Sequence, residues 1–206
     1  MDANTLTQTL VWTIISFISG SLMLAYWFGR AVTKTDARSI GDGNPGAANV
    51  MKAGGTKVGL IAMLLDAFKG AIPVSIAKYV IGLTGVPLII VALAPIFGHA
   101  YSPFLRGRGG KAVAVSFGVW TALTIWEAPT FGGILLGVWF SVVARSGWAV
   151  LLTLLCLIGY YLITWRDPVM LVVLAINALL LVWKYRADFR HAPGFRPWIL
   201  RRLPNR

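Results

Sequence analysis

Two glycine-rich stretches hold most of the polar side chains that could do chemistry. The first, residues 36–49, reads Asp-Ala-Arg-Ser-Ile-Gly-Asp-Gly-Asn-Pro-Gly-Ala-Ala-Asn. This density of glycine, proline and asparagine is typical of a tight, fixed loop whose exposed backbone N–H groups can bind an anion. An ordinary turn is the alternative for this loop alone. Residues 41–46 also match the dinucleotide pattern G-x-G-x-x-G, but that pattern requires a preceding β-strand, and an apolar segment precedes it here.

The second stretch, residues 98–111, reads Gly-His-Ala-Tyr-Ser-Pro-Phe-Leu-Arg-Gly-Arg-Gly-Gly-Lys and leads directly into an apolar segment. If that segment is a helix, its N-terminal dipole, bare glycine amides and nearby cations together suit a phosphate group. The stretch is not a Walker A sequence, because Leu105 and Ala112 stand where that motif has glycine and Ser or Thr. The alternative is a basic loop whose cations simply lie near lipid headgroups.

Three further ionisable residues lie in or beside apolar segments. Asp66 and Lys69 are three residues apart, which places them on one face of a helix. Charges at membrane depth are costly and normally pair or line a polar cavity, so a structural ion pair competes with a functional role. His99 could act as a general base, donate to a phosphate or serve at a helix end. Two histidines, seven scattered carboxylates and one cysteine give no metal-ligand spacing, and we expect no metal site.

The elements that position these residues are predicted to lie in a membrane. The chain has 206 residues, of which 57% are hydrophobic and 13% charged, and its mean hydropathy is +0.74. A soluble domain is about half apolar and about a quarter charged. Residues 150–164 and 169–183 contain no charged side chain at all, and a membrane span needs roughly 20 mostly apolar residues. We therefore expect an all-α integral membrane protein.

Hydropathy marks seven apolar segments, at residues 9–28, 58–77, 80–101, 112–125, 129–144, 148–164 and 168–183. Several are short for a crossing of about 30 Å, which tilt or local thinning of the bilayer can accommodate. The expectation is a single polytopic membrane domain over residues 1–206 with about seven transmembrane helices. We expect the first segment to be a retained span, because no Lys or Arg precedes Arg30 and no convincing cleavage site follows.

The charge distribution predicts the orientation. The formal net charge is +12, and cytoplasmic loops of membrane proteins collect Lys and Arg. With the N-terminus outside, most cations fall in the two glycine-rich stretches and in a basic cytoplasmic tail, residues 184–206, whereas the outside connections hold only Lys78 and Arg166. The tail carries interleaved aromatic residues and suits contact with anionic membrane lipids. This explanation of the charge leaves little reason to expect nucleic-acid binding.

Taken together, the motifs resemble a known family. Residues 38–50 (Arg-Ser-Ile-Gly-Asp-Gly-Asn-Pro-Gly-Ala-Ala-Asn-Val), 65–70 (Leu-Asp-Ala-Phe-Lys-Gly) and the glycine, histidine, arginine and lysine positions of 98–114 are similar to the bacterial acyl-phosphate-dependent glycerol-3-phosphate acyltransferases. The resemblance implies a seven-helix enzyme of the bacterial inner membrane with cytoplasmic active-site loops. It further implies transfer of a fatty acyl group from acyl phosphate to glycerol 3-phosphate, giving lysophosphatidic acid, without a metal or organic cofactor.

That reaction demands particular residues. Acyl phosphate is already activated, so the site must hold two phosphates together and orient a hydroxyl rather than supply a nucleophile. Under the resemblance, the candidate catalytic residues are Asp42, His99 and Lys111. The candidate substrate-binding residues are Arg38, Gly43, Asn44, Asn49, Lys52, Lys69, Arg108, Gly109, Gly110, Ser146 and Asp188.

The chain also departs from the family pattern. Asp42 replaces a serine of the first motif, and could act as a base or repel a phosphate. Ala112 and Val115 replace a glycine and a threonine of the second motif. A third motif, Arg-His-Arg-Glu-Asn-Ile in the family, has its nearest counterpart at residues 184–189, where Tyr185 and Asp188 stand in place of His and Asn. The alternatives to an enzyme are therefore a non-catalytic paralogue that binds lipid or phosphate, and a small transporter.

Overall fold

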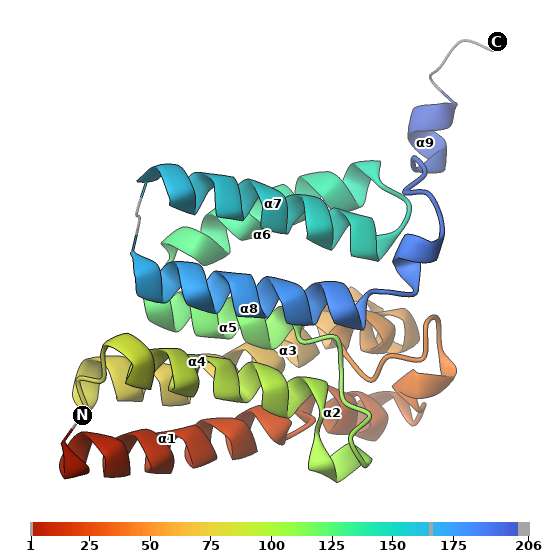
Figure 1. Cartoon of the computed structure of the whole chain (residues 1–206). Coiled ribbons are helices and arrows are strands. Elements are labelled where there is room, and N and C mark those ends of the chain that lie inside the picture. Colours follow the sequence, from red (N-terminus) through yellow and green to blue (C-terminus); the bar gives the residue numbers. More distant parts are fainter. Residues whose placement is uncertain (1, 165–166, 202–206) are drawn as a thin grey trace. The chain divides into compact units, whose positions relative to one another are not determined.

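The computed structural model describes residues 2–164 and 167–201, and the regular secondary structure in these ranges is helical apart from one isolated β-bridge (Figure 1). The predicted cation Arg166 and residues 202–206 of the predicted basic tail lie outside the described residues. The chain folds as two compact units, Met1–Trp126 and Glu127–Arg206. The expectation of an all-helical membrane protein is confirmed in its fold class, and the single domain over the whole chain remains a prediction.

Unit 1 contains both glycine-rich stretches. Its elements are α1 (Ala3–Ser21), α2 (Leu24–Thr33), the 3-10 turn η1 (Ala37–Ser39), α3 (Ala47–Ser75), the π-turn η2 (Ile76–Val80), α4 (Gly85–Ala100), the 3-10 turn η3 (Pro103–Leu105) and α5 (Val113–Thr124). The first stretch therefore connects α2 to α3, and the second connects α4 to α5. Both connections lie at the end of unit 1 opposite the start of α1 (Figure 1).

The first predicted span is a broken helix. The backbone leaves the helical region at Leu22, whose ψ is 121°. Side chains of α3 satisfy the backbone groups that this break leaves open: the Asp66 carboxylate accepts from the Ala25 N–H at 3.4 Å, and the Lys69 ammonium donates to the Leu22 carbonyl at 2.5 Å. Because unpaired backbone groups are costly away from water, these two charged residues stabilise the break.

Glycines allow the helices of unit 1 to approach closely. A Cβ on Gly20 of α1 would overlap the backbone of Pro95 in α4, and a Cβ on Gly118 of α5 would overlap the carbonyl of Ala67 in α3. Small residues at helix contacts are typical of membrane bundles, where van der Waals packing replaces the hydrophobic effect as the main attraction between helices. These contacts hold α4 against α1 and α5 against α3.

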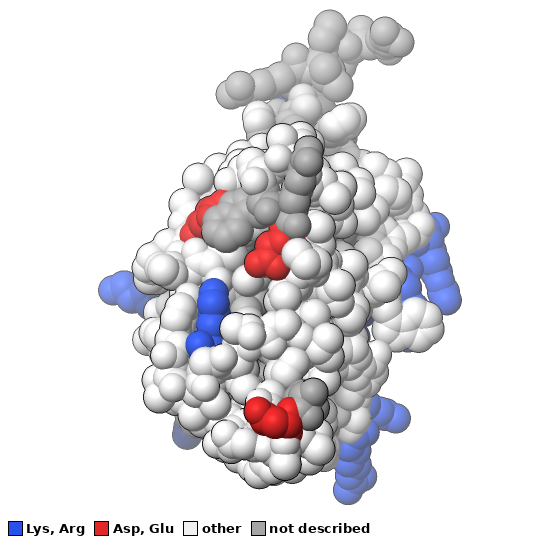
Figure 2. All heavy atoms as spheres, turned by 60° about the vertical axis from the view of Figure 1, so that its left-hand side comes forward, with Lys and Arg blue, Asp and Glu red and all other residues white. Residues whose placement is uncertain are grey.

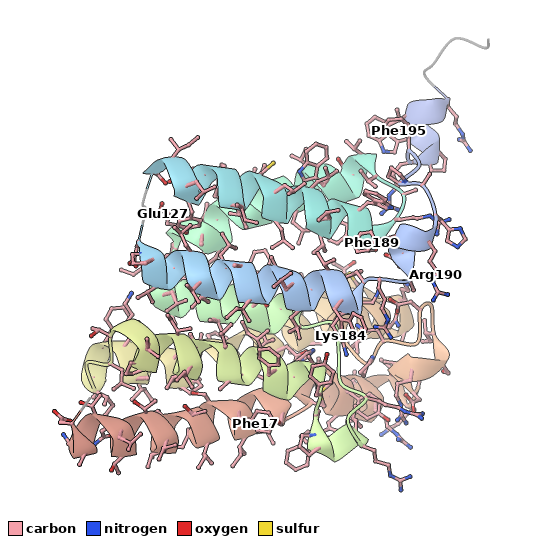
Figure 3. The ribbon with its side chains drawn as sticks, in the orientation of Figure 1. Phe17, Glu127, Lys184, Phe189, Arg190 and Phe195 are labelled. Atoms are coloured by element: carbon pink, nitrogen blue, oxygen red, sulfur yellow. The ribbon has the colours of Figure 1, made fainter. Side chains whose placement is uncertain are left out.

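Unit 2 consists of α6 (Glu127–Val142), α7 (Ser146–Thr164), α8 (Pro168–Lys184), the 3-10 turn η4 (Asp188–Arg190) and the short α9 (Pro197–Leu200). Its C-terminal segment returns along the turn between α6 and α7, at the end of the unit opposite Glu127 (Figure 3). The Ala144 N–H donates to the Gly194 carbonyl at 3.2 Å, and the Arg196 N–H donates to the Val142 carbonyl at 2.9 Å. Backbone pairing thus fixes this part of the tail.

Four helical stretches are long and apolar enough to cross a membrane: Ala3–Thr33, Ala47–Val80, Gly85–Leu105 and Ser146–Thr164. Three shorter apolar helices, α5, α6 and α8, account for the remaining predicted segments. Large apolar side chains such as Leu10 and Ile14 are exposed along α1, and most of the surface seen in Figure 2 is uncharged. Several helices begin away from the predicted ends: α1 begins at Ala3 rather than at 9, and α3 begins at Ala47 rather than at 58. The third segment begins at Gly85 rather than at 80, because η2 extends the preceding helix to Val80.

Candidate functional site

The first loop folds around the side chain of Asn49, which is buried in the first turn of α3. Its Nδ2 donates to the Ile40 carbonyl at 2.7 Å, to Asp42 Oδ1 at 2.8 Å and to the Asn44 carbonyl at 3.0 Å. Gly41 and Gly43 have φ values of 59° and 73°, a left-handed conformation that glycine adopts without strain. The sequence expectation of a tight, fixed loop is therefore confirmed.

Arg38 is held at the start of this loop by Asp36. The Arg38 guanidinium donates to Asp36 Oδ2 at 2.6 Å and lies over the Tyr26 ring, 5.0 Å from its centroid. The Tyr26 hydroxyl donates to the same carboxylate at 3.1 Å. The hydrogen bond from Arg38 is the main cause that holds the pKa of Asp36 well below its usual value. This predicted phosphate-binding cation is thus engaged within its own loop.

The second loop packs back on the end of α4. The Gly110 N–H donates to the His99 carbonyl at 3.0 Å. A Cβ on Gly109 would overlap the His99 carbonyl oxygen, and a Cβ on Gly110 would overlap the His99 imidazole. Close approach to His99 therefore requires glycine at both positions. The Gly110 N–H, which was predicted to donate a hydrogen bond to phosphate, donates within the protein instead.

The two loops meet at one contact. Lys111 Nζ lies 2.8 Å from Asp42 Oδ2, with side-chain exposures of 18% and 47% respectively. Lys52 Nζ donates to Oδ1 of Asn49, the residue whose Nδ2 donates to Asp42, at 3.2 Å. We call Asp42, Asn44, Asn49, Lys52 and Lys111 the loop cluster.

The charge state of Asp42 follows from this contact. Partial burial acts to raise the pKa of Asp42, but the hydrogen bond and charge of Lys111, with hydrogen bonds from Asn49 and Asn44, outweigh it and hold the pKa below its usual value. At neutral pH the contact is an ion pair that solvent can reach.

A second charged group lies inside unit 1 and consists of Asp66, Lys69 and His99, which we call the buried cluster. Lys69 Nζ is 2.8 Å from Asp66 Oδ1 and 2.8 Å from His99 Nδ1. An ammonium can only donate, so His99 Nδ1 accepts this bond and a neutral His99 carries its proton on Nε2, the nitrogen that faces Gly110. His99, predicted as a catalytic residue, is only 3% exposed, and the structure connects it to the helix break at Leu22 through Lys69.

The remaining predicted site residues lie elsewhere. The Arg108 side chain is exposed, and Gly43 adjoins Asp42 in the first loop. Ser146 is the first residue of α7 in unit 2, and Asp188 Oδ2 accepts from the N–H of the next residue, Gly147, at 2.6 Å. The structure thus unites Asp42, Asn44, Asn49, Lys52 and Lys111, and brings Lys69 to His99 in a separate cluster of the same unit.

Sequence reasoning missed two residues that shape the loops. Asp36 orients Arg38, and its position two residues before a cation was the available signal. Ser102 is fully buried, and its hydroxyl donates to the Ser21 carbonyl at 2.6 Å. That contact ties the second loop to the end of α1, and nothing in the local pattern points to it. Over the described residues, no group of three or more His, Cys, Asp or Glu side chains is placed to hold a metal ion.

The chain is similar to known proteins over most of its length. The family model described as glycerol-3-phosphate acyltransferase matches residues 10–192. A glycerol-3-phosphate acyltransferase of Anaeromyxobacter sp. is 36% identical over 193 residues, which cover 88% of this chain and 91% of the relative. One of Lawsonia intracellularis is 36% identical over 185 residues, covering 88% and 90%.

Solved structures show the same likeness. The crystal structure of PlsY (YgiH), an integral membrane glycerol 3-phosphate acyltransferase, in its glycerol 3-phosphate form superposes with a TM-score of 0.77 at 27% identity, covering 88% of this chain and 90% of that one. Its lysophosphatidic acid form gives a TM-score of 0.76. With its sequence, fold and ordered motifs in agreement, the chain belongs to the glycerol-3-phosphate acyltransferase family.

Proposed function

We propose that this protein transfers a fatty acyl group from acyl phosphate to glycerol 3-phosphate and so produces lysophosphatidic acid. The observation that carries the proposal is the contact between Lys111 and Asp42, because it brings the two phosphate-suited loops together at one end of unit 1. Family membership supports the reaction. The solved relatives, whose titles name a glycerol 3-phosphate form and a lysophosphatidic acid form, support the acceptor and the product.

The chemistry needs positioning more than a reactive side chain. The acceptor hydroxyl oxygen attacks the acyl carbon, an ester C–O bond forms, and the bond from that carbon to the phosphate oxygen breaks. Inorganic phosphate leaves with the bonding electrons, and the hydroxyl proton passes to phosphate or solvent. Because the leaving group is already good, holding both phosphates beside cations supplies most of what is required. Lys111 and Lys52 are the two cations of the loop cluster that would bind these phosphates.

The proposed site lies on the cytoplasmic side of a bacterial inner membrane. We place the N-terminus outside and count α1 with α2 as one span, followed by α3, α4, α5, α6, α7 and α8, which gives seven crossings. Lys and Arg concentrate in both loops of unit 1 and in the C-terminal tail, as the positive-inside rule requires. A cysteine introduced at the exposed Ser39 should react with an impermeant maleimide only in inverted vesicles. Labelling of that cysteine in intact cells would show that the loop faces the outside and would contradict this orientation.

The direct experiment supplies purified protein with acyl phosphate and labelled glycerol 3-phosphate. We expect labelled lysophosphatidic acid, and a Lys111→Ala variant should lose about 10- to 100-fold in kcat/KM, because a charged hydrogen bond to the phosphate is lost. Lys57→Ala is the matched control, since Lys57 is an exposed lysine further along α3. Folded parent protein that makes no product would remove the proposal.

A non-catalytic paralogue that binds phosphate or lipid is the second candidate. The observation in its favour lies in unit 2, where Asp188 stands at a position of the third family motif and is engaged with the first turn of α7. The neighbouring Tyr185 is buried. Complementation of a bacterial strain that lacks its acyltransferase separates the two candidates: growth excludes the paralogue, and failure of a well-expressed protein to support growth favours it.

A further inference from the structure

Asp42 is held in place by its own loop as well as by Lys111. Its Oδ1 accepts from Asn49 Nδ2 at 2.8 Å and from the Asn44 N–H at 3.2 Å. The residues on either side, Gly41 and Gly43, are both in the left-handed region. The loop therefore presents Oδ2 in a fixed position, and that oxygen is the one that meets Lys111.

The partner of Asp42 is the cation that a substrate phosphate needs. Nearly half of the Asp42 side chain is exposed, whereas Lys111 is mostly covered. A phosphate that reaches Lys111 from solvent must displace Oδ2 or lie beside it. Because Asn49 and Asn44 keep Oδ1 in place, the displaced carboxylate stays close, and it repels a phosphomonoester that carries about −1.5 to −2 charges at neutral pH.

We infer that Asp42 is an internal anion that competes with the phosphate of glycerol 3-phosphate for Lys111 and thereby sets the affinity of the site. The inference rests on the proposed function and deepens it. Asp42 weakens the capture of substrate phosphate and of the inorganic phosphate that the reaction releases. It is not the general base, since both of its oxygens are engaged and its depressed pKa makes it a poor proton acceptor near pH 7.

The test replaces the carboxylate by a neutral amide or by a neutral hydroxyl group. Asp42→Asn and Asp42→Ser both keep an oxygen that can accept from Asn49 and Asn44, so the loop retains its internal hydrogen bonds. We expect either variant to lower the KM for glycerol 3-phosphate by about two- to fivefold, the range of a partly exposed ion pair. Inhibition by inorganic phosphate should strengthen by a similar factor. Asp2→Asn is the matched control, because Asp2 caps α1 at the opposite end of unit 1.

Two results would overturn the inference. An unchanged or higher KM in both variants shows that Asp42 does not compete, and a fall in kcat of about 100-fold or more identifies it as a base. A second measurement separates this inference from the proposed function. Binding of inorganic phosphate is measured, without acyl donor, as the shift that phosphate causes in the thermal unfolding temperature. If the parent makes no lysophosphatidic acid but Asp42→Asn binds phosphate more tightly than the parent, the proposed function is refuted and the role of Asp42 stands. If the parent is active but the substitution leaves phosphate binding unaltered, only the role of Asp42 is refuted.

Discussion

Unit 1 contains two lysine–aspartate pairs with the same 2.8 Å separation and different surroundings. Lys69 and Asp66 lie three residues apart on α3, and each side chain is 2% exposed. Asp42 lies in the loop that precedes α3 and Lys111 in the loop that follows α4, and solvent reaches both side chains. The buried pair also binds the backbone at the α1–α2 break and His99, whereas the exposed pair joins one loop to the other.

The difference shows where substrate chemistry can take place. Removing one partner of a buried pair leaves an uncompensated charge and costs about 3–5 kcal/mol, so such a pair cannot exchange its partners during turnover. An exposed pair contributes about 0.2–1 kcal/mol and can open for a competing anion. We therefore propose a positioning role for the buried cluster and phosphate capture by the loop cluster.

The largest expected effect comes from a substitution that breaks the buried pair. Lys69→Met leaves Asp66 buried without its counter-charge and should lower the free energy of unfolding by about 3–5 kcal/mol. Lys111→Met, the same change in the exposed pair, should lower it by no more than about 1 kcal/mol. Denaturant unfolding in detergent measures both. Equal losses would erase the distinction between the two clusters.

An intermediate effect comes from the glycine that connects the clusters. Gly110→Ala places a methyl group on the His99 imidazole, and such overpacking should cost about 1–3 kcal/mol and displace Lys111. The KM for glycerol 3-phosphate should rise in the same variant. Gly137→Ala, at a helical glycine of α6 with open space around it, should be neutral or stabilise by up to about 1 kcal/mol. If Gly110→Ala behaves like this control, the His99 contact has no positioning role.

The smallest expected effect concerns pH. A carboxyl with a depressed pKa contributes stability that is present above its unfolded value of about 3.9 and is lost as pH falls through the folded value. Asp42 therefore stays ionised and paired with Lys111 from about pH 5.5 to about pH 8. The ratio of KM for glycerol 3-phosphate between parent and Asp42→Asn should be constant from about pH 7 to about pH 8, where the substrate phosphate is mostly a dianion. A ratio that changes within that range would show that Asp42 changes its charge there.

Features set by neighbouring residues could be predicted from the sequence. Hydropathy located the apolar helices of both units, and the spacing of Asp66 and Lys69 indicated an ion pair that the structure confirms. The glycine content of residues 36–49 predicted a tight loop, and Gly41 and Gly43 indeed adopt the left-handed conformation there.

Features set by distant residues could not be predicted from local patterns. The break at Leu22 directly follows Gly20 and Ser21, but its backbone groups are satisfied by Asp66 and Lys69, more than 40 residues away. The hydrogen bond of Ser102 to Ser21 spans 81 residues. Asp188 was predicted as a substrate ligand from its place in a motif, and its contact with the first turn of α7 depends on how the C-terminal segment returns along the α6–α7 turn.

The most direct test of the division between the two pairs is equilibrium binding of labelled glycerol 3-phosphate to purified protein without acyl donor. The account predicts that Lys111→Ala weakens binding by about 10- to 100-fold while its unfolding temperature stays near that of the parent, and that Lys57→Ala binds as the parent does. Binding by Lys111→Ala that equals the parent's would contradict the account, because the phosphate would then be held elsewhere in the molecule.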